Sequence, residues 1–179
     1  VCVGVYILIS LVAGVAAGVL AVIALRAPVW RSSGVVELHT DHPPDRVVES
    51  FTGPRPPVLA FQWGLAETVE TDGDTVRYAV SYFFGLRTVE VAVQAETTTL
   101  PNGDQRIELT VSEGGQPWAT YAATVDRKAG HTVVAVEYTA DRRFSLRRVP
   151  QQLLAERYRD EALGVQGYDV ADRTSRVGR

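Results

Sequence analysis

Cysteine and lysine are nearly missing from this 179-residue chain, and methionine is wholly missing. Cys2 is the single cysteine, so no disulfide can form within the chain. Lys128 is the single lysine among 18 basic residues. From Gly34 onward the chain has 16 basic and 21 acidic residues, because only Arg26 and Arg31 precede that point. A net charge of −5 gives this part none of the broad basic surface that a nucleic-acid-binding domain needs.

Charge is also absent from the stretch between Val1 and Leu25. Twenty-five helical residues rise about 37 Å, which exceeds a hydrocarbon core of about 30 Å. A cleaved signal peptide would have a shorter apolar core, basic residues before it and an A-x-A site after it. The stretch has none of these features. The sequence therefore predicts a transmembrane anchor over 1–26, followed by a juxtamembrane linker over 27–33.

Two features of this anchor bear on topology and assembly. Arg26 and Arg31 follow the apolar stretch and no basic residue precedes it, which places the following domain in the cytoplasm by the positive-inside rule. Gly14 and Gly18 form a GxxxG pattern, which lets two helices approach closely and predicts a homodimer through the anchor. The alternative is that small residues are simply frequent in apolar helices.

The remainder predicts an α+β domain with a seven-stranded antiparallel sheet. Residues 34–40 are typical of a first strand. A short helix follows, with Asp41 as its cap, Pro43 and Pro44 in its first turn and Asp45 near its positive end. The pattern of the apolar stretch 58–63 leaves its type open, with a second short helix as the candidate. Period-two alternation and turn residues then predict strands at 65–71, 75–84, 87–98, 104–112, 117–126 and 131–140.

A helix is expected after the strands, because apolar residues recur there at helical spacing. They are Leu146, Val149, Leu153, Leu154, Tyr158, Ala162 and Val165. The strands alternate so that one face of the sheet is apolar, and this face needs a cover. We expect the C-terminal helix to supply it. The polar residues 169–179 are predicted to form a flexible tail.

The order of elements resembles that of the START-like, or SRPBCC, superfamily, also called helix-grip or polyketide cyclase/dehydrase-like. The segment from Val36 to Val48, VELHTDHPPDRVV, looks like the opening strand and proline-marked helix of that family. The resemblance covers residues 34–168. It implies a curved sheet that grips the last helix, with an apolar cavity between them. Members bind lipids, sterols, quinones, polyketides or hormones, and a minority are enzymes.

Aromatic side chains on the covered face are the candidate ligand-binding residues, because amphipathic rings line pockets and each offers a hydrogen bond. The predicted set is Tyr78, Tyr82, Trp118, Tyr138, Leu154 and Tyr158. The alternative is that these rings only fill the core between sheet and helix. Arg142, Arg143, Arg147 and Arg148 form the single basic cluster, and they are either a solvated helix entrance or a contact with anionic lipid headgroups.

No catalytic set of nucleophile and base is recognisable, and no cofactor is predicted. His39, Asp41 and His42 do not predict a metal site, since no third strong ligand lies nearby in the sequence. The leading hypothesis is a membrane-tethered binding module for a hydrophobic small molecule or lipid. The alternatives are a cyclase- or hydratase-type enzyme on a hydrophobic substrate, and a structural or interaction protein with a filled core.

Overall fold

The computed structural model of the chain describes residues 18, 31–82, 87–128, 130–141 and 158–178. Within these ranges, no helix has both the length and the hydropathy that crossing a bilayer requires. The predicted anchor over 1–26 lies outside the described residues, except for Gly18, which is helical and exposed. Gly14 lies outside them as well, so self-association through the two glycines stays a prediction.

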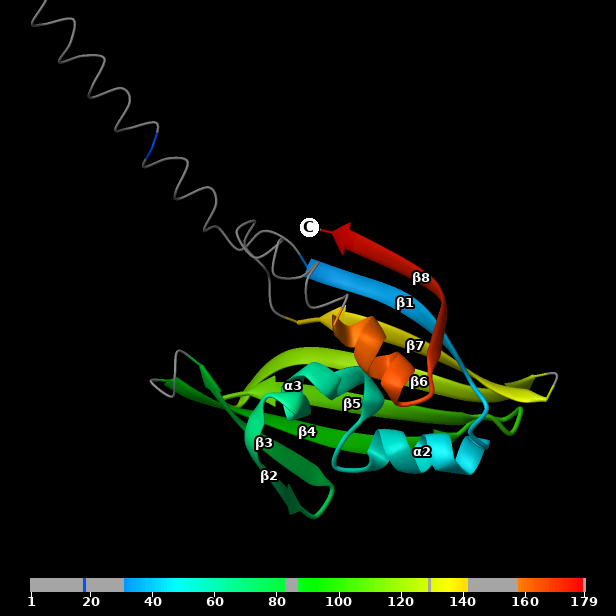
Figure 1. The fold of residues 1–179 in the computed structure, drawn as a ribbon, viewed down its shortest axis with the longest axis horizontal. Helices are drawn as coiled ribbons and strands as arrows, with labels where there is room; N and C mark the ends of the chain where they lie inside the picture. Colours follow the sequence, from blue (N-terminus) through cyan, green and yellow to red (C-terminus); the bar gives the residue numbers. More distant parts are fainter. Residues whose placement is uncertain (1–17, 19–30, 83–86, 129, 142–157, 179) are drawn as a thin grey trace, which may run out of the picture.

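The described residues form an α+β fold around one antiparallel sheet of eight strands (Figure 1). The strand order is β2-β3-β4-β5-β6-β7-β1-β8, so the first strand lies between the seventh and the last. The predicted count of seven is therefore one too low. The strands are β1 (Arg31–Thr40), β2 (Ala66–Asp72), β3 (Thr75–Tyr82), β4 (Arg87–Thr99), β5 (Gln105–Glu113), β6 (Gln116–Lys128), β7 (His131–Ala140) and β8 (Asp169–Gly178).

Two glycines make the hairpin turn between β5 and β6. Glu113 pairs with Gln116, which leaves Gly114 and Gly115 as a two-residue loop with φ of 57° and 76°. Positive φ at both central residues defines a type I′ turn, whose twist matches that of the flanking strands. The predicted turn at this place is confirmed, and the six strands from β2 to β7 follow one another as a meander.

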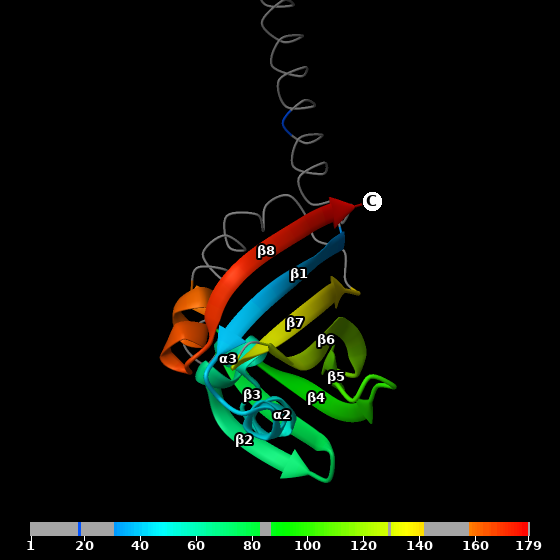
Figure 2. The same ribbon diagram turned by 90° about the vertical axis from the view of Figure 1, so that its right-hand side faces the viewer.

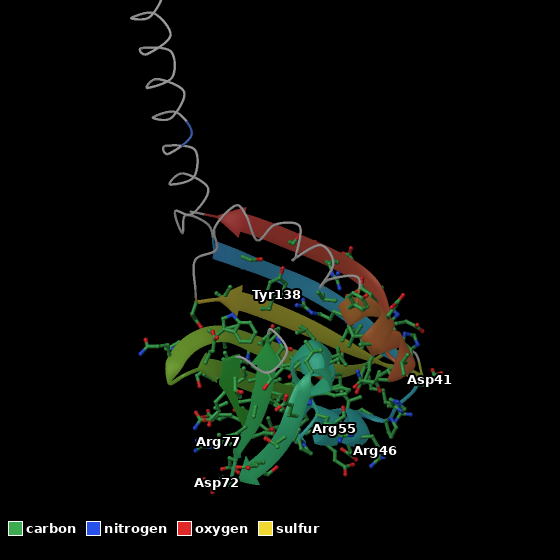
Figure 3. The ribbon with its side chains drawn as sticks, turned by 60° about the vertical axis from the view of Figure 1, so that its left-hand side comes forward. Asp41, Arg46, Arg55, Asp72, Arg77 and Tyr138 are labelled. Atoms are coloured by element: carbon green, nitrogen blue, oxygen red, sulfur yellow. The ribbon has the colours of Figure 1, made fainter. Side chains whose placement is uncertain are left out.

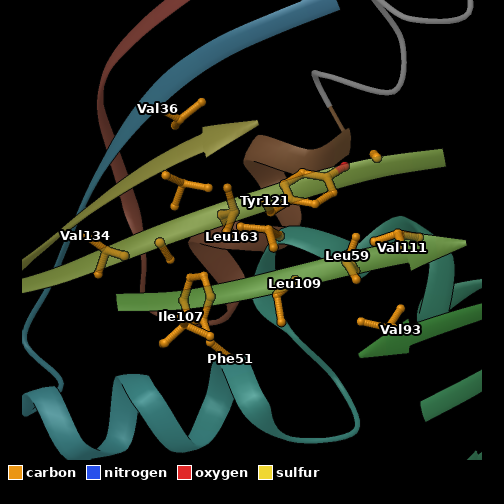
Figure 4. Close-up of a cluster of buried hydrophobic side chains, with 14 of the residues drawn as sticks. Val36, Phe51, Leu59, Val93, Ile107, Leu109, Val111, Tyr121, Val134 and Leu163 are labelled. Atoms are coloured by element: carbon orange, nitrogen blue, oxygen red, sulfur yellow. The ribbon is translucent and has the colours of Figure 1, made fainter. Parts of the chain in front are cut away.

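One face of the sheet carries the core, and residues alternate between that face and solvent (Figure 4). In β5, Ile107, Leu109 and Val111 are buried, while Glu108 and Thr110 between them are exposed. Alternation of this kind is required of an antiparallel sheet that is covered on one side. The predicted period of two is confirmed in this strand.

Three short helical segments follow β1: α2 (Pro44–Thr52), η1 (Pro57–Leu59) and α3 (Ala60–Gly64). The stretch 58–63, for which a second short helix was the candidate, is therefore helical. Val47 and Phe51 of α2 are fully buried against the sheet. The expectation that Asp41 caps this helix is wrong, because Pro43 occupies the N-cap position without a side-chain hydrogen bond. Pro44 at the first helical position has its φ already set for the helix.

A helix over 158–165 lies on the same side of the sheet as α2 and α3 (Figures 1 and 2). Leu163 packs this helix against the core and is only 1% exposed, whereas Tyr158 and Val165 are 61% and 90% exposed. This helix is the described part of the predicted C-terminal helix. Residues 146–157 of that prediction lie outside the described residues.

Asp169–Gly178 forms β8, so the expectation of a flexible tail over 169–179 is wrong. It pairs with β1 along nearly the whole length of that strand, from Arg31 to His39. Thr40 Oγ1 donates to the Gly167 carbonyl at 2.7 Å and so fixes the turn before β8. Thr132 Oγ1 donates to the His42 carbonyl at 2.6 Å, in the segment between β1 and α2. β1 also begins at Arg31, inside the predicted linker.

A close approach between β1 and β7 depends on the absence of a side chain at Gly34. Gly34 pairs with Tyr138. A Cβ atom at Gly34 would lie 2.6 Å from the Tyr138 ring and 2.6 Å from the Thr174 carbonyl oxygen. The glycine therefore lets the Tyr138 ring lie over β1 and lets β8 pair beside it.

We predict that Gly34→Ala lowers the free energy of unfolding by about 1–3 kcal/mol, as overpacking does in tightly packed sites. Gly64→Ala is the matched control, because no atom lies within 4 Å of a Cβ placed there. Urea unfolding monitored by circular dichroism measures both. Equal effects of the two substitutions would contradict the packing role of Gly34.

Candidate functional site

A small compartment lies between the covered face of the sheet and the 158–165 helix. Its volume is about 20 Å³. Inward-facing residues of β1, β6 and β7 form its floor and Leu163 of the helix forms its roof (Figure 4). The apolar lining is Val36, Leu38, Val58, Tyr121, Val136, Tyr138 and Leu163. Since a cavity of this size holds about one water, the compartment is nearly closed by its own side chains.

Two tyrosines supply polar groups to this apolar lining. Tyr121 of β6 and Tyr138 of β7 are register partners, with ring centroids 6.3 Å apart. Tyr121 is only 8% exposed, and its burial raises the pKa of its phenol above 10.0. Arg159 nearby lowers the pKa of Tyr121 and offsets part of that rise. Tyr121 is therefore a neutral phenol at physiological pH, able to donate a hydrogen bond.

Two arginines lie at the edge of the compartment, and they differ in their partners. Arg173 of β8 pairs with Asp160 of the helix: Nη1 donates to Oδ2 at 3.2 Å, and Nη2 donates to Oδ1. This double hydrogen bond neutralises the Arg173 guanidinium and ties β8 to the helix. Arg159 is half-buried. No hydrogen bond or ion pair joins it to any other described residue.

A second hollow of about 650 Å³ lies outside α2. It is an open surface hollow, and several of its lining side chains bind one another. Arg46 pairs with Glu49 at 2.5 Å, and the Ser50 and Tyr168 hydroxyls are 2.7 Å apart. Figure 3 shows Arg46 and Arg55 near α2, away from Tyr138 under β1 and β8. The two hollows are therefore separate.

The predicted ligand-binding residues do not gather at one place. Tyr138 lines the compartment. Tyr78 is fully buried in β3 and donates to the Pro54 carbonyl at 2.9 Å. Trp118 packs half-buried against the core, and Tyr158 faces solvent. Neither lines the compartment, and a role of these residues in ligand binding stays a prediction.

The remaining predicted site residues lie outside the described part. These are the Tyr82 side chain, Leu154, and the basic cluster of Arg142, Arg143, Arg147 and Arg148. Their predicted contacts with a ligand or a membrane surface are untested.

Sequence reasoning missed Tyr121, Arg159 and Arg173. A register shift between Val111 and Ser112, opposite Trp118, interrupts the alternation of β6, so the sequence pattern pointed to Trp118 in place of Tyr121. Arg173 lies in the segment that was expected to be a flexible tail. The useful signal was Tyr121 itself, which sits in step with Ala123 and Val125 on one face.

Comparison with known proteins supports the fold. No protein-family model and no curated protein matches the chain. The structure of Ara h 8.0201, a Bet v 1-like protein, matches with a TM-score of 0.50 and 11% identity over 76% of this chain and 97% of that chain. Mll3558 from Rhizobium loti matches with a TM-score of 0.48 and 19% identity, over 75% of this chain and 96% of that chain. CalU16 from Micromonospora echinospora matches with a TM-score of 0.42 and 14% identity, over 74% of this chain and 74% of that chain. The likeness to Ara h 8.0201 is consistent with a helix-grip fold, and it bears on the fold alone.

We predict that Tyr78 stabilises the folded chain and makes its stability depend on pH. Burial raises its pKa to about 12 in the folded chain, from 10.0. The unfolded chain therefore ionises first, and the free energy of unfolding falls as pH rises from about 10 to 12. Tyr78→Phe removes this contribution, and at neutral pH it lowers stability by about 0.5–1.5 kcal/mol because the Pro54 carbonyl loses its donor.

Denaturant unfolding of wild type, Tyr78→Phe and Tyr158→Phe across this pH range measures both effects. The exposed Tyr158 is the control. The assignment fails if Tyr78→Phe shows the same dependence on pH as Tyr158→Phe.

Proposed function

We propose that this chain is a binding module for a hydrophobic small molecule or lipid, held between the covered face of the sheet and the 158–165 helix. The observation that carries the proposal is the compartment itself. It has an apolar floor, two phenol groups and a roof whose described part is the 158–165 helix. Ligand pockets share this composition: mostly apolar and aromatic, with a few polar groups that fix orientation.

A ligand must displace the helix, because the compartment holds about 20 Å³. Over residues 158–165 this helix has one fully buried side chain, Leu163, whose exposure would cost about 1.5–3 kcal/mol. A ligand that buries about 200 Å² of apolar surface gains about 5 kcal/mol at about 25 cal/mol per Å². The gain exceeds the cost of exposing Leu163, and the remainder opposes the cost of loosening the Arg173–Asp160 pairing that ties the helix to β8.

A structural role with a filled core is the second candidate function. The small volume of the compartment favours it, since a closed core has few voids larger than a water molecule. The two candidates differ in one respect that can be measured. A binding module takes up apolar molecules in competition with its own roof, and a filled core does not.

The expected result is that Val36→Phe weakens uptake of an apolar fluorescent probe by at least about tenfold, or about 1.4 kcal/mol. The added ring fills the floor of the compartment, which Val36 lines. Val35→Phe is the matched control, because Val35 is the adjacent residue on the opposite face and is 44% exposed. Probe titration of the purified full chain measures both.

Urea unfolding shows whether either variant is destabilised. Native mass spectrometry of the wild-type chain then identifies the molecules that co-purify with it. Absence of probe uptake and of any bound mass in the wild-type chain would favour the filled core.

We also propose that the anchor over 1–26 holds this module at a membrane, with the domain on the cytoplasmic side and the arginines at 142, 143, 147 and 148 near lipid headgroups. The support is the sequence: an uncharged stretch long enough to span a bilayer, followed by Arg26 and Arg31. A tether would keep the module beside a source of hydrophobic ligands.

The full chain is therefore expected to stay in the membrane fraction after an alkaline carbonate wash, which strips proteins that adhere only by charge. Replacing Leu11 and Val15 with Arg should release it, because a charged side chain costs about 2.5–3.5 kcal/mol at the centre of a spanning helix. Replacing Thr71 and Thr110, which are exposed in the sheet, with Arg is the control. Release of the wild-type chain would overturn the tether.

A further inference from the structure

We infer that the ligand of this compartment carries an anionic head group, a carboxylate or a phosphate, that binds the Arg159 guanidinium beside the Tyr121 hydroxyl. The inference rests on the proposed function and adds to it the class of ligand. Its basis is that two arginines lie at one edge of the compartment, and only Arg173 has an acidic partner among the described residues.

Arg159 is a half-buried cation without a counter-ion among the described residues. It lines the compartment. It lies close enough to Tyr121 to lower the pKa of that phenol. A partly desolvated charge is costly unless an opposite charge or several hydrogen-bond acceptors meet it. The described lining offers it neither.

Arg173, at the same edge, has its charge neutralised by a carboxylate. Asp160 binds it through two hydrogen bonds, so Arg173 and Asp160 together carry no net charge. Asp160 is thereby engaged on Arg173. Among the described lining residues, the charge that remains is the positive charge of Arg159.

The neighbouring polar groups favour an anion as well. The Tyr121 hydroxyl is held neutral by burial and can donate. Tyr138 lies opposite it, with its hydroxyl 3.5 Å from Ser32 Oγ. A guanidinium and phenol hydroxyl groups together bind a carboxylate or phosphate by charge-assisted hydrogen bonds, which are about twice as strong as neutral ones. The positive charge of Arg159 repels a cation. The apolar tail of such a ligand would lie along Val36, Val136 and Leu163.

The test compares a fatty acid, a lysophosphatidic acid and a fatty alcohol of equal chain length as competitors of the apolar probe on the full chain. The wild-type chain is expected to bind one or both acids at least about tenfold more tightly than the alcohol. The tighter of the two acids identifies the head group. Arg159→Gln should reduce the affinity for the acids to that for the alcohol and leave the alcohol unchanged. Arg159→Lys should restore most of the preference.

Arg176→Gln is the control, because Arg176 lies exposed on β8. An acid preference that survives Arg159→Gln, or equal binding of acid and alcohol by the wild type, overturns the inference and leaves the proposed function standing. Loss of both acid and alcohol in Arg159→Gln assigns the arginine a structural role and also overturns it. Failure of all three competitors and the probe to bind the wild type instead removes the proposed function.

Discussion

The pairing of β1 with both β7 and β8 is the constraint on which the rest of the structure depends. It brings the first strand and the last strand of the described chain side by side, at the far end from the β2 edge. The 158–165 helix must then lie over the covered face, because it connects to β8 through the short turn bound by Thr40. Without β8, Arg173 would have no fixed position from which to bind Asp160. The position of the helix over the sheet and the pairing of Arg173 with Asp160 thus both depend on this strand order.

Burial and charge divide the compartment into two ends with different chemistry. Val36, Val136 and Leu163 form an apolar end that stabilises the fold by excluding water. Tyr121 and Arg159 form a polar end, where the phenol and the guanidinium lie next to the apolar, low-dielectric core. Charged groups in such places interact more strongly than at the surface. The same arrangement that closes the core against water therefore leaves one polar end suited to recognition.

Much of this fold was predictable from the sequence, because its signals are local. The period of two in β3, β4 and β5 and the Gly-Gly turn at Gly114 and Gly115 are properties of a few consecutive residues. β8 was not predictable in this way. As an edge strand it places polar side chains in solvent along much of its length, which imitates a disordered tail, and its partner β1 lies far away in the chain.

The candidate site was predicted less well than the fold, for a related reason. Tyr138 was among the aromatic residues expected on the covered side, whereas Tyr121 was hidden by the register shift opposite Trp118. Arg159 and Arg173 were missed because their importance lies in which of them has a partner. A pairing between a helix and an edge strand is a tertiary fact, and no periodicity encodes it.

Tyr138, whose ring lies beside that of Tyr121 at the polar end, also connects the compartment to the proposed tether. Tyr138 packs over Gly34, and its hydroxyl lies 3.5 Å from Ser32, near the start of β1. Gly34 is three residues from Arg31, about 10 Å along a strand. If 1–26 spans a bilayer, the chain enters the domain at the end of β1 that carries these residues. An amphiphile leaving the bilayer would meet this end of the domain first. The anionic head group and the apolar tail then have separate binding partners within one small compartment, which is a physical basis for selecting charged lipids over neutral ones.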